Sequence, residues 1–240
     1  IEQAQKALRA LQGGGRRSAP SSQSESEELA QEPATPGAAE PPAGPRRPFH
    51  PRTTMPGLLG QSGLLRTPAA DTPAGGSAAL SASTFSDGDR VLSATLSPDD
   101  ATEITAGLTS GGQPDAVLLS AKREIYRSDD ARTRAAVGVL DATDEIDTTA
   151  YGVVSQDVGS RRLATTVSAG IGGGDLLDGL FLGGAVPVDD RTTALAEWLD
   201  IGDDDDLSIG LSWRASDRFN LKAGVVDGDL AGNVSLDTRF

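Results

Sequence analysis

Two acidic clusters are the parts of this sequence whose residue types and spacing come closest to a chemical site. Four aspartates follow one another in Asp203–Asp206. Ca²⁺ binds several oxygens that converge on one point, and acidic residues on a loop supply part of such a set. A solvated acidic loop needs no further ligands, so we favour a solvated loop over a calcium site. We expect neither a metal nor a cofactor. The second cluster contains Asp141, Asp144, Glu145 and Asp147.

The residues required for nucleophilic or phosphate chemistry are missing from the expected folded region. His50 is the only histidine and lies in a Pro-rich stretch, so neither a Ser-His-Asp triad nor a histidine zinc site can be built. The Gly-rich run at 170–174 is followed by neither a Lys nor a helical pattern, so it predicts a hairpin turn. Because the chain has no Cys, thiol catalysis and disulfides are also excluded. We expect that the protein is not an enzyme.

The overall charge excludes nucleic-acid binding. The formal net charge is −14 and the pI is about 4.4, whereas phosphate contacts need clustered Lys and Arg. With 29 Gly, 14 Pro and 4% aromatic residues among 240, few bulky side chains are available for a soluble core. The composition therefore favours folds that bury only a small apolar core.

Alternating apolar and polar residues occupy most of the chain from residue 56 onward. In the last nine residues, Val234, Leu236, Thr238 and Phe240 share one face, and polar side chains share the other. Gly, Asp, Ser or Pro clusters separate such segments, which is typical of an antiparallel sheet. The predicted strands are 76–86, 90–97, 102–109, 116–124, 132–140, 149–157, 161–172, 179–188, 192–200, 206–214, 219–226 and 232–240.

The polar face of these strands distinguishes a barrel from a sandwich. Both folds give the same alternation, but the crowded lumen of a small barrel favours Gly, Ser and Ala. Glycine inside an exposed strand weakens it and usually marks close packing or curvature. We therefore predict an all-β fold, an antiparallel transmembrane β-barrel of about twelve strands. The mid-strand glycines are Gly138, Gly152, Gly170, Gly183, Gly210 and Gly224.

The charged residues on the polar face are the candidate site. Glu197 and Asp237 are carboxylates of the kind that cleave glycosides when they face each other across a cleft. Basic residues on the same face are available to neutralise them, so we predict ion pairs inside a narrow barrel rather than catalysis. The predicted lumen-lining residues are Lys122, Arg134, Glu197, Arg214, Lys222, Asp237 and Arg239.

Aromatic residues at strand ends are candidates for the membrane interface. Trp213, Phe219 and Phe240 fall on the apolar face, where an interfacial girdle would place them. The alternative is that they cover the rim of a soluble core. A sandwich core would also contain the apolar residues Leu207, Ile209, Leu211, Leu221 and Val225, which a barrel exposes to lipid.

Three regions divide the chain. Residues 1–12 predict a helical segment, the end of a longer helix or coiled coil, because Ile1, Ala4, Leu8 and Leu11 have heptad spacing. Residues 13–55 predict a disordered Pro/Ser/Glu-rich linker, and residues 56–240 form the β-barrel domain. The start at Ile1 indicates a fragment of a longer chain. No run of about 18 apolar residues predicts a transmembrane helix, which leaves a barrel open.

Residues 56–80 resemble the opening of the YjbH-like outer-membrane β-barrels. The matching pattern is a Gly-x-x-Gly-Leu start, then Thr-Pro-x-Ala, then a Pro-x-Gly turn before the first strand. Residues 137–145, 195–202 and 227–232 are also similar to that family, so the resemblance spans 56–240. It implies an association with exopolysaccharide production or export. The matching residues are Gly60, Gly63, Leu64, Thr67, Pro68, Ala70, Pro73 and Gly75.

The sequence as a whole predicts a barrel in the outer membrane of a diderm bacterium. We expect an envelope scaffold or narrow, porin-like conduit, which the resemblance links to exopolysaccharide export. The expected partners are outer-membrane lipid, the barrel-assembly machinery through the C-terminal strand, and polysaccharide or export proteins, with no nucleic acid. The alternative is a secreted all-β carbohydrate-binding module.

Overall fold

A computed structural model describes residues 54–240 except 112–114, 147, 160–163, 175 and 202–203. The chain divides into a unit of residues 1–46 and a unit of residues 47–240, and the second contains all the described residues. The predicted helix at 1–12 lies outside them. So does the predicted linker at 13–55, apart from its last two residues.

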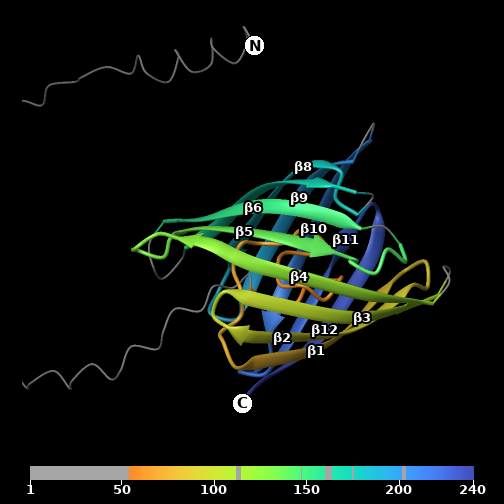
Figure 1. The fold of residues 1–240 in the computed structure, drawn as a ribbon, viewed down its shortest axis with the longest axis horizontal. Helices are drawn as coiled ribbons and strands as arrows, with labels where there is room; N and C mark the ends of the chain where they lie inside the picture. The colour runs from red at the N-terminus through yellow and green to blue at the C-terminus, as the bar shows by residue number, and fades with distance from the viewer. Residues whose placement is uncertain (1–53, 112–114, 147, 160–163, 175, 202–203) are drawn as a thin grey trace, which may run out of the picture. The chain divides into compact units, whose positions relative to one another are not determined.

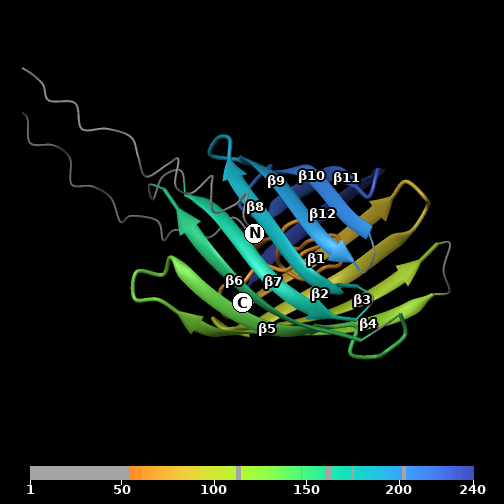
Figure 2. The same cartoon turned by 90° about the horizontal axis from the view of Figure 1, so that it is seen from above.

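Twelve antiparallel strands build the second unit. Each strand pairs with its neighbours in sequence, and β1 pairs with β12, so the sheet closes on itself (Figures 1 and 2). The strands are β1 (Ser77–Phe85), β2 (Arg90–Asp99), β3 (Thr102–Ser110), β4 (Ala116–Arg127), β5 (Thr133–Leu140), β6 (Thr149–Val158), β7 (Thr165–Gly173), β8 (Gly179–Pro187), β9 (Thr192–Ile201), β10 (Asp204–Arg214), β11 (Phe219–Val226) and β12 (Asp229–Arg239).

The closed sheet confirms the barrel prediction and its number of strands. The sandwich alternative is wrong, because two packed sheets would leave open edges, whereas Ser77 pairs with Arg239 and Phe85 with Ala231 along the whole seam. Strand boundaries differ by a few residues, most clearly in the strand predicted at 161–172, which is Thr165–Gly173 in the structure. Gly170 and Gly172 therefore belong to β7, and the predicted Gly-rich turn is reduced to the residues that follow it.

The two faces of the wall are the reverse of those of a soluble protein. In β2, Ser93, Thr95 and Ser97 point inward and are buried, while Leu92 and Leu96 point outward and are about half exposed. β10 repeats the pattern, with Leu207, Ile209, Leu211 and Trp213 all more than 40% exposed. Since successive side chains leave a strand on opposite faces, the alternation gives a polar interior and an apolar outer belt.

The two ends of the barrel are defined by the course of the strands. The proximal end is the one where β1 begins beside the end of β12, at the pair Ser77–Arg239. The distal end is the one where β1 finishes at Phe85 and turns into β2. Odd-numbered strands therefore run from proximal to distal and even-numbered strands run back.

Residues 54–76, which precede β1, fill the lumen and are called the plug here. Figure 2 shows this segment, in orange, inside the ring of strands. Leu58, Leu64, Leu65, Ala69 and Ala70 have no exposed surface. The sequence predicts a barrel domain at 56–240 that includes most of the plug, but no pattern in it predicts that these residues lie inside the wall. The lumen is thus occupied by the chain's own main chain and leucines.

Two tight loops give the plug its shape. Isolated β-bridges join Pro56 to Ser62 and Gly63 to Pro68, and the Leu58 amide donates to the Leu65 carbonyl at 2.7 Å. A Cβ atom on Gly63 would lie 2.3 Å from the Thr67 carbonyl oxygen, so only glycine fits there. The loops satisfy some plug main-chain groups internally and leave others directed at the wall.

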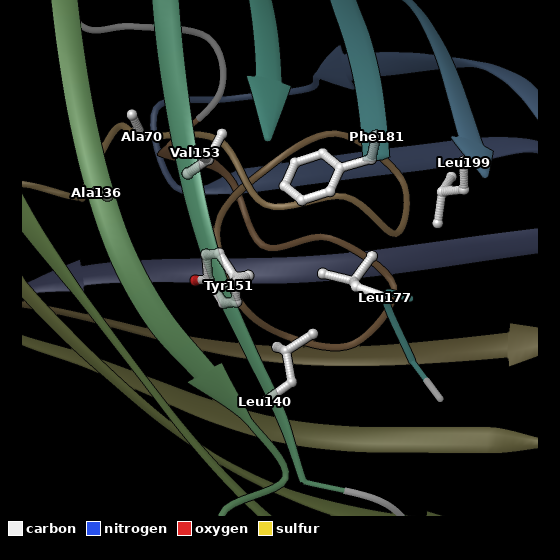
Figure 3. Packing of buried hydrophobic residues seen from close by; sticks show 8 residues of the cluster. All are labelled: Ala70, Ala136, Leu140, Tyr151, Val153, Leu177, Phe181 and Leu199. Carbon is white, nitrogen blue, oxygen red and sulfur yellow. The ribbon is translucent and has the colours of Figure 1, made fainter. Parts of the chain in front are cut away.

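The apolar part of the interior packs around the plug in two clusters. Leu58, Leu64 and Leu65 pack with Ala185, Leu195, Val226 and Ala231. The second cluster is larger and joins Ala70 to inward-facing wall residues (Figure 3). The first cluster is built on three plug leucines, whereas the second takes only Ala70 from the plug. The second cluster consists of Ala70, Ala136, Leu140, Tyr151, Val153, Leu177, Phe181 and Leu199.

Candidate functional site

Glu197 on β9 binds three consecutive main-chain amides of the plug. Its carboxylate accepts from the amides of Leu65 at 3.1 Å, Arg66 at 2.9 Å and Thr67 at 3.1 Å, and from the Thr67 hydroxyl at 2.8 Å. The residue is 2% exposed. Successive amides that converge on one anion form a nest, and hydrogen bonds to an ionised carboxylate are stronger than neutral ones. Glu197 therefore fixes the bend of the plug at 65–67.

Lys222 on β11 binds the plug from its carbonyl side. Its ammonium donates to the carbonyl oxygens of Met55 at 3.1 Å, Gly63 at 2.8 Å and Leu64 at 2.8 Å. An ammonium has three donor hydrogens, so these contacts use all of them. Lys222 thus joins the start of the plug to its middle, one residue before the amides that Glu197 holds.

Glu103 on β3 and Lys122 on β4 form an ion pair on another side of the lumen. Their side chains are 3.1 Å apart and have no exposed surface. Both also contact Ser62 of the plug: its amide and hydroxyl donate to Glu103, and Lys122 donates to its carbonyl at 2.9 Å. Lys122 further donates to the Ala69 carbonyl at 3.1 Å. The charges here neutralise each other while they hold the plug.

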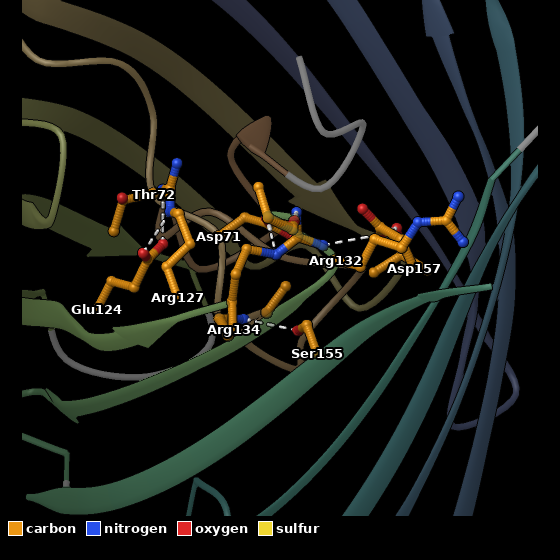
Figure 4. Close-up of polar contacts among 12 residues, drawn as sticks. Asp71, Thr72, Glu124, Arg127, Arg132, Arg134, Ser155 and Asp157 are labelled. Atoms are coloured by element: carbon orange, nitrogen blue, oxygen red, sulfur yellow. Dashed lines mark hydrogen bonds and ion pairs between the residues drawn. The ribbon is translucent and has the colours of Figure 1, made fainter. Parts of the chain in front are cut away.

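Arg134 on β5 lies between a plug carboxylate and a wall carboxylate. Its guanidinium is 2.8 Å from Asp71 of the plug and 2.7 Å from Asp157 on β6 (Figure 4). Asp157 also accepts from the Thr166 hydroxyl on β7 at 2.8 Å. All three ionic side chains are at least nine-tenths buried. This triad attaches the C-terminal part of the plug to three strands of the wall.

Uncharged wall residues complete the contacts with the plug. The Tyr151 hydroxyl donates to the Gln61 side chain at 2.5 Å, and the Ala70 amide donates to the Ser155 hydroxyl at 2.9 Å. The Thr95 hydroxyl donates to the Gly60 carbonyl at 2.9 Å. Polar contacts with the plug therefore come from strands all around the barrel.

Gly183 on β8 makes room for a plug leucine. A Cβ atom on Gly183 would lie 2.1 Å from Leu64 Cδ1, and a Cβ atom on Gly170 would overlap the Phe181 side chain. At these positions, the structure explains the prediction that mid-strand glycines mark close packing. At these two positions, a large side chain in the lumen lies over a glycine of the wall.

The other predicted lumen residues lie near the proximal end. Asp237 on β12 is partly buried and accepts from the Asn220 amide at 2.6 Å. Arg214 is half-buried, and Arg239 is exposed. Glu197 and Asp237 accept hydrogen bonds from neutral groups, and Lys122 and Arg134 form ion pairs with acids that were not predicted.

Three acids that bind the predicted cations were missed by the sequence reading. Glu103 and Asp157 each occupy an inward position of a strand, which the alternation could have shown. Asp71 lies in the plug, where no periodic pattern indicates a direction. The predicted interface aromatics Trp213, Phe219 and Phe240 lie on the outward face towards the proximal end and are 44%, 37% and 82% exposed.

The acidic clusters do not assemble a metal site in the described part of the chain. No group of three or more His, Cys, Asp or Glu side chains converges there. The Asp141 carboxylate instead accepts from the Thr143 hydroxyl and the Ile146 amide of its own loop. Among the residues that the structure describes, none belongs to a helix long and apolar enough to cross a membrane.

Comparison with known proteins gives similarity of fold only. No family model and no curated protein matches this sequence. The KdgM porin has 12% identity and a TM-score of 0.49, covering 68% of this chain and 99% of its own. LpxR from Salmonella typhimurium has 12% identity and a TM-score of 0.42, covering 68% of this chain and 100% of its own. An outer membrane channel from Pseudomonas putida F1 has 12% identity and a TM-score of 0.41, covering 70% of this chain and 96% of its own. No residue role is transferred from these proteins.

Proposed function

We propose that this chain is an outer-membrane β-barrel of a diderm bacterium and acts as a narrow conduit that its own plug holds closed. The observation that carries the proposal is the inversion of polarity across one wall. Leu80, Leu92, Leu207 and Ile209 are at least 56% exposed outside, while Glu197 is buried inside against plug amides. An apolar belt of this kind requires lipid, and every strand edge is paired, as a membrane demands.

The plug determines what the conduit does at rest. Its leucines have no exposed surface, and its polar groups are held by several strands of the wall. Passage of a solute therefore requires displacement of residues 54–76. We include no catalytic step in this proposal.

The C-terminal strand and the sequence resemblance suggest the partners. β12 exposes Val234 and Leu236 on its outward face, and we propose that this strand is the contact for the barrel-assembly machinery. The motif that resembles YjbH-like proteins falls within the plug. We therefore propose that a role in exopolysaccharide export, if this barrel has one, depends on the plug rather than on the wall.

Membrane insertion is tested by refolding the full chain from urea with and without detergent micelles. We expect β-type circular dichroism and a heat-sensitive gel mobility only when micelles are present. A soluble monomer that folds in plain buffer would overturn the proposal, because the apolar belt would then not require lipid or detergent.

Gating is tested with a disulfide that locks the plug. The chain has no Cys, so Ala70→Cys with Ser155→Cys introduces a single pair where the plug amide meets the wall hydroxyl at 2.9 Å. The matched control is Ser86→Cys with Asp229→Cys, which joins β12 to the β1–β2 turn where these side chains are 2.7 Å apart. Conductance in planar bilayers is the readout.

We expect rare openings in the wild type, none in the oxidised plug lock, and recovery with a reductant. The control pair should behave like the wild type in both redox states. Openings that persist in the oxidised lock would contradict gating by the plug. A barrel that inserts but never conducts, even when Glu197→Gln loosens the plug, would instead be an envelope scaffold.

A further inference from the structure

A cavity of about 260 Å³ lies above the plug at the distal end of the barrel. Leu59 of the plug forms part of its lining, and Phe85 of β1 and inward side chains of β2, β4 and β5 form much of the remaining apolar surface. The side chains from β2, β4 and β5 are Val91, Leu118 and Leu140, joined by Leu176 from the β7–β8 connection. The plug thus provides the floor of a pocket as well as closing the lumen.

The rim of the cavity is polar and predominantly acidic. Asp87 and Asp89 of the β1–β2 turn line it together with Asp141, and Arg90 is the basic residue among the lining side chains. Asp141 is 1% exposed, and its contact with the Ile146 amide at 2.6 Å holds the β5–β6 loop over the pocket. Ile146 itself lines the cavity.

The charge of the surrounding surface reinforces the rim. The described residues of the connections between strands at the distal end include eight Asp or Glu and no Lys or Arg. The described residues of the connections at the proximal end include six acids and three Arg. A mouth in which one sign of charge predominates concentrates ions of the opposite sign. Organic cations are therefore enriched at the distal mouth and anions are repelled.

The size and lining of the cavity define the ligand. Since one water occupies about 30 Å³ of the liquid, the cavity has room for a molecule of roughly eight or nine non-hydrogen atoms. Apolar walls with a few polar groups at one side are the usual composition of a small-molecule site. We propose that this distal pocket binds a small organic ammonium ion, with its apolar body on Leu59 and Leu118 and its charged group at Asp87 and Asp89.

The test uses benzylammonium as the probe and the full chain folded in non-ionic micelles. Affinity is measured by calorimetric titration, with benzyl alcohol and benzoate as probes of similar shape but different charge. An ion pair at an exposed rim is worth up to about 1 kcal/mol, or roughly fivefold in affinity. We therefore expect benzylammonium to bind about fivefold more tightly than benzyl alcohol, and benzoate to bind more weakly than either.

Two variants separate the apolar body from the charged rim. Leu118→Trp fills the cavity and should abolish binding of both the amine and the alcohol. Asp87→Asn with Asp89→Asn changes one exposed and one partly buried side chain and should reduce the affinity for benzylammonium to that for benzyl alcohol. Asp217→Asn, in the proximal β10–β11 turn, is the matched control and should change nothing.

Equal affinity for the amine and the alcohol in the wild-type protein would overturn the proposal, as would wild-type binding in Leu118→Trp. If Leu118→Trp loses the heat-sensitive mobility of the folded barrel, the Asp87 and Asp89 variant decides the outcome. Binding needs only a folded, plugged barrel. Failure to bind therefore leaves the proposed conduit untouched, and failure to conduct leaves the binding result valid.

Discussion

Two sides of the lumen hold the plug by different chemistry. On the side of β3 to β6, charges meet charges: Glu103 pairs with Lys122, and Arg134 lies between Asp71 and Asp157. On the side of β9 and β11, Glu197 and Lys222 bind mainly the amides and carbonyls of the plug backbone. The first side depends mainly on particular partner side chains, whereas the second depends mainly on the path of the main chain, with one added ion pair between Arg66 of the plug and Asp206 on β10.

The difference matters because a buried charge is costly unless it is compensated. An ion pair loses its compensation when either partner is removed, and the remaining charge then destabilises the fold. A carboxylate held by amides leaves mainly neutral donors behind when it is removed. The ionic side should therefore be the more sensitive of the two to single substitutions.

Glu103→Gln is expected to have the largest effect. It leaves the buried Lys122 ammonium without its carboxylate, which should lower the free energy of unfolding by about 3–5 kcal/mol. Urea unfolding in micelles, followed by tryptophan fluorescence, measures the change. The exposed Asp217→Asn variant is the control and should be within about 0.5 kcal/mol of wild type. Equal losses in the two variants would show that the ion pair does not stabilise the plugged barrel.

Glu197→Gln should have a smaller effect, about 2–3 kcal/mol, because it leaves main-chain donors with one weaker acceptor. It should also loosen the plug, and trypsin cleavage after Arg66 reports that directly. The comparison variant is Asp205→Asn on the neighbouring strand, where the side chain is exposed. If Arg66 stays as protected in Glu197→Gln as in Asp205→Asn, the plug is not held by this carboxylate.

Double-mutant cycles sharpen the comparison between the two sides. For Glu103→Gln with Lys122→Met, we expect a coupling energy of about 2 kcal/mol, since each residue compensates the other. For Glu197→Gln with Lys222→Met, the coupling should be about half as large, because the two act through adjacent plug residues. A larger coupling on the Glu197 side would reverse the assignment of the two chemistries.

Gly183→Val tests the apolar contact on the main-chain side. The new side chain overlaps Leu64, and overpacking should destabilise the barrel by about 1–3 kcal/mol. Leu64→Ala in the same chain should restore part of the loss, as measured by the urea midpoint. The same Val at Gly152, where an added Cβ meets nothing within 4 Å, is the control. No rescue by Leu64→Ala would mean that the plug leucine does not occupy this position.

Substitutions on the outer face should have the smallest effect. Leu207→Val and Leu211→Ile replace one apolar side chain that is more than half exposed by another, so stability in micelles should change by about 0.5 kcal/mol or less. The urea midpoint again serves as the measurement. Losses as large as those of Gly183→Val would indicate that these residues belong to a packed interface.

Sequence patterns predicted the wall well and the plug not at all. The alternation of Leu207, Ile209 and Leu211 with small polar residues defined both the strand and its two faces, because a strand has a period of two. Closure followed from the crowding indicated by glycines such as Gly183. Local periodicity is therefore sufficient for the parts of this fold that repeat.

The plug has no periodic pattern of apolar and polar residues. Its Gly and Pro residues resembled the opening of a known barrel family, but nothing local showed that Leu64 would pack onto Gly183 more than one hundred residues later. The same limit explains the partners of Glu197. Its inward direction was predictable from the strand pattern, whereas its contacts with the amides of 65–67 depend on a bend that only the complete barrel stabilises.

The position of the plug immediately before β1 also constrains the order of assembly. β1 forms one side of the seam with β12, and the plug joins it at Ser77. Were the seam to close first, Glu197 and Lys222 would face an interior without partners, and a leucine-rich segment would have to enter past them. We expect the plug to be laid against the open sheet before β1 pairs with β12. Formation of the last strand pair and sealing of the lumen are thus a single event.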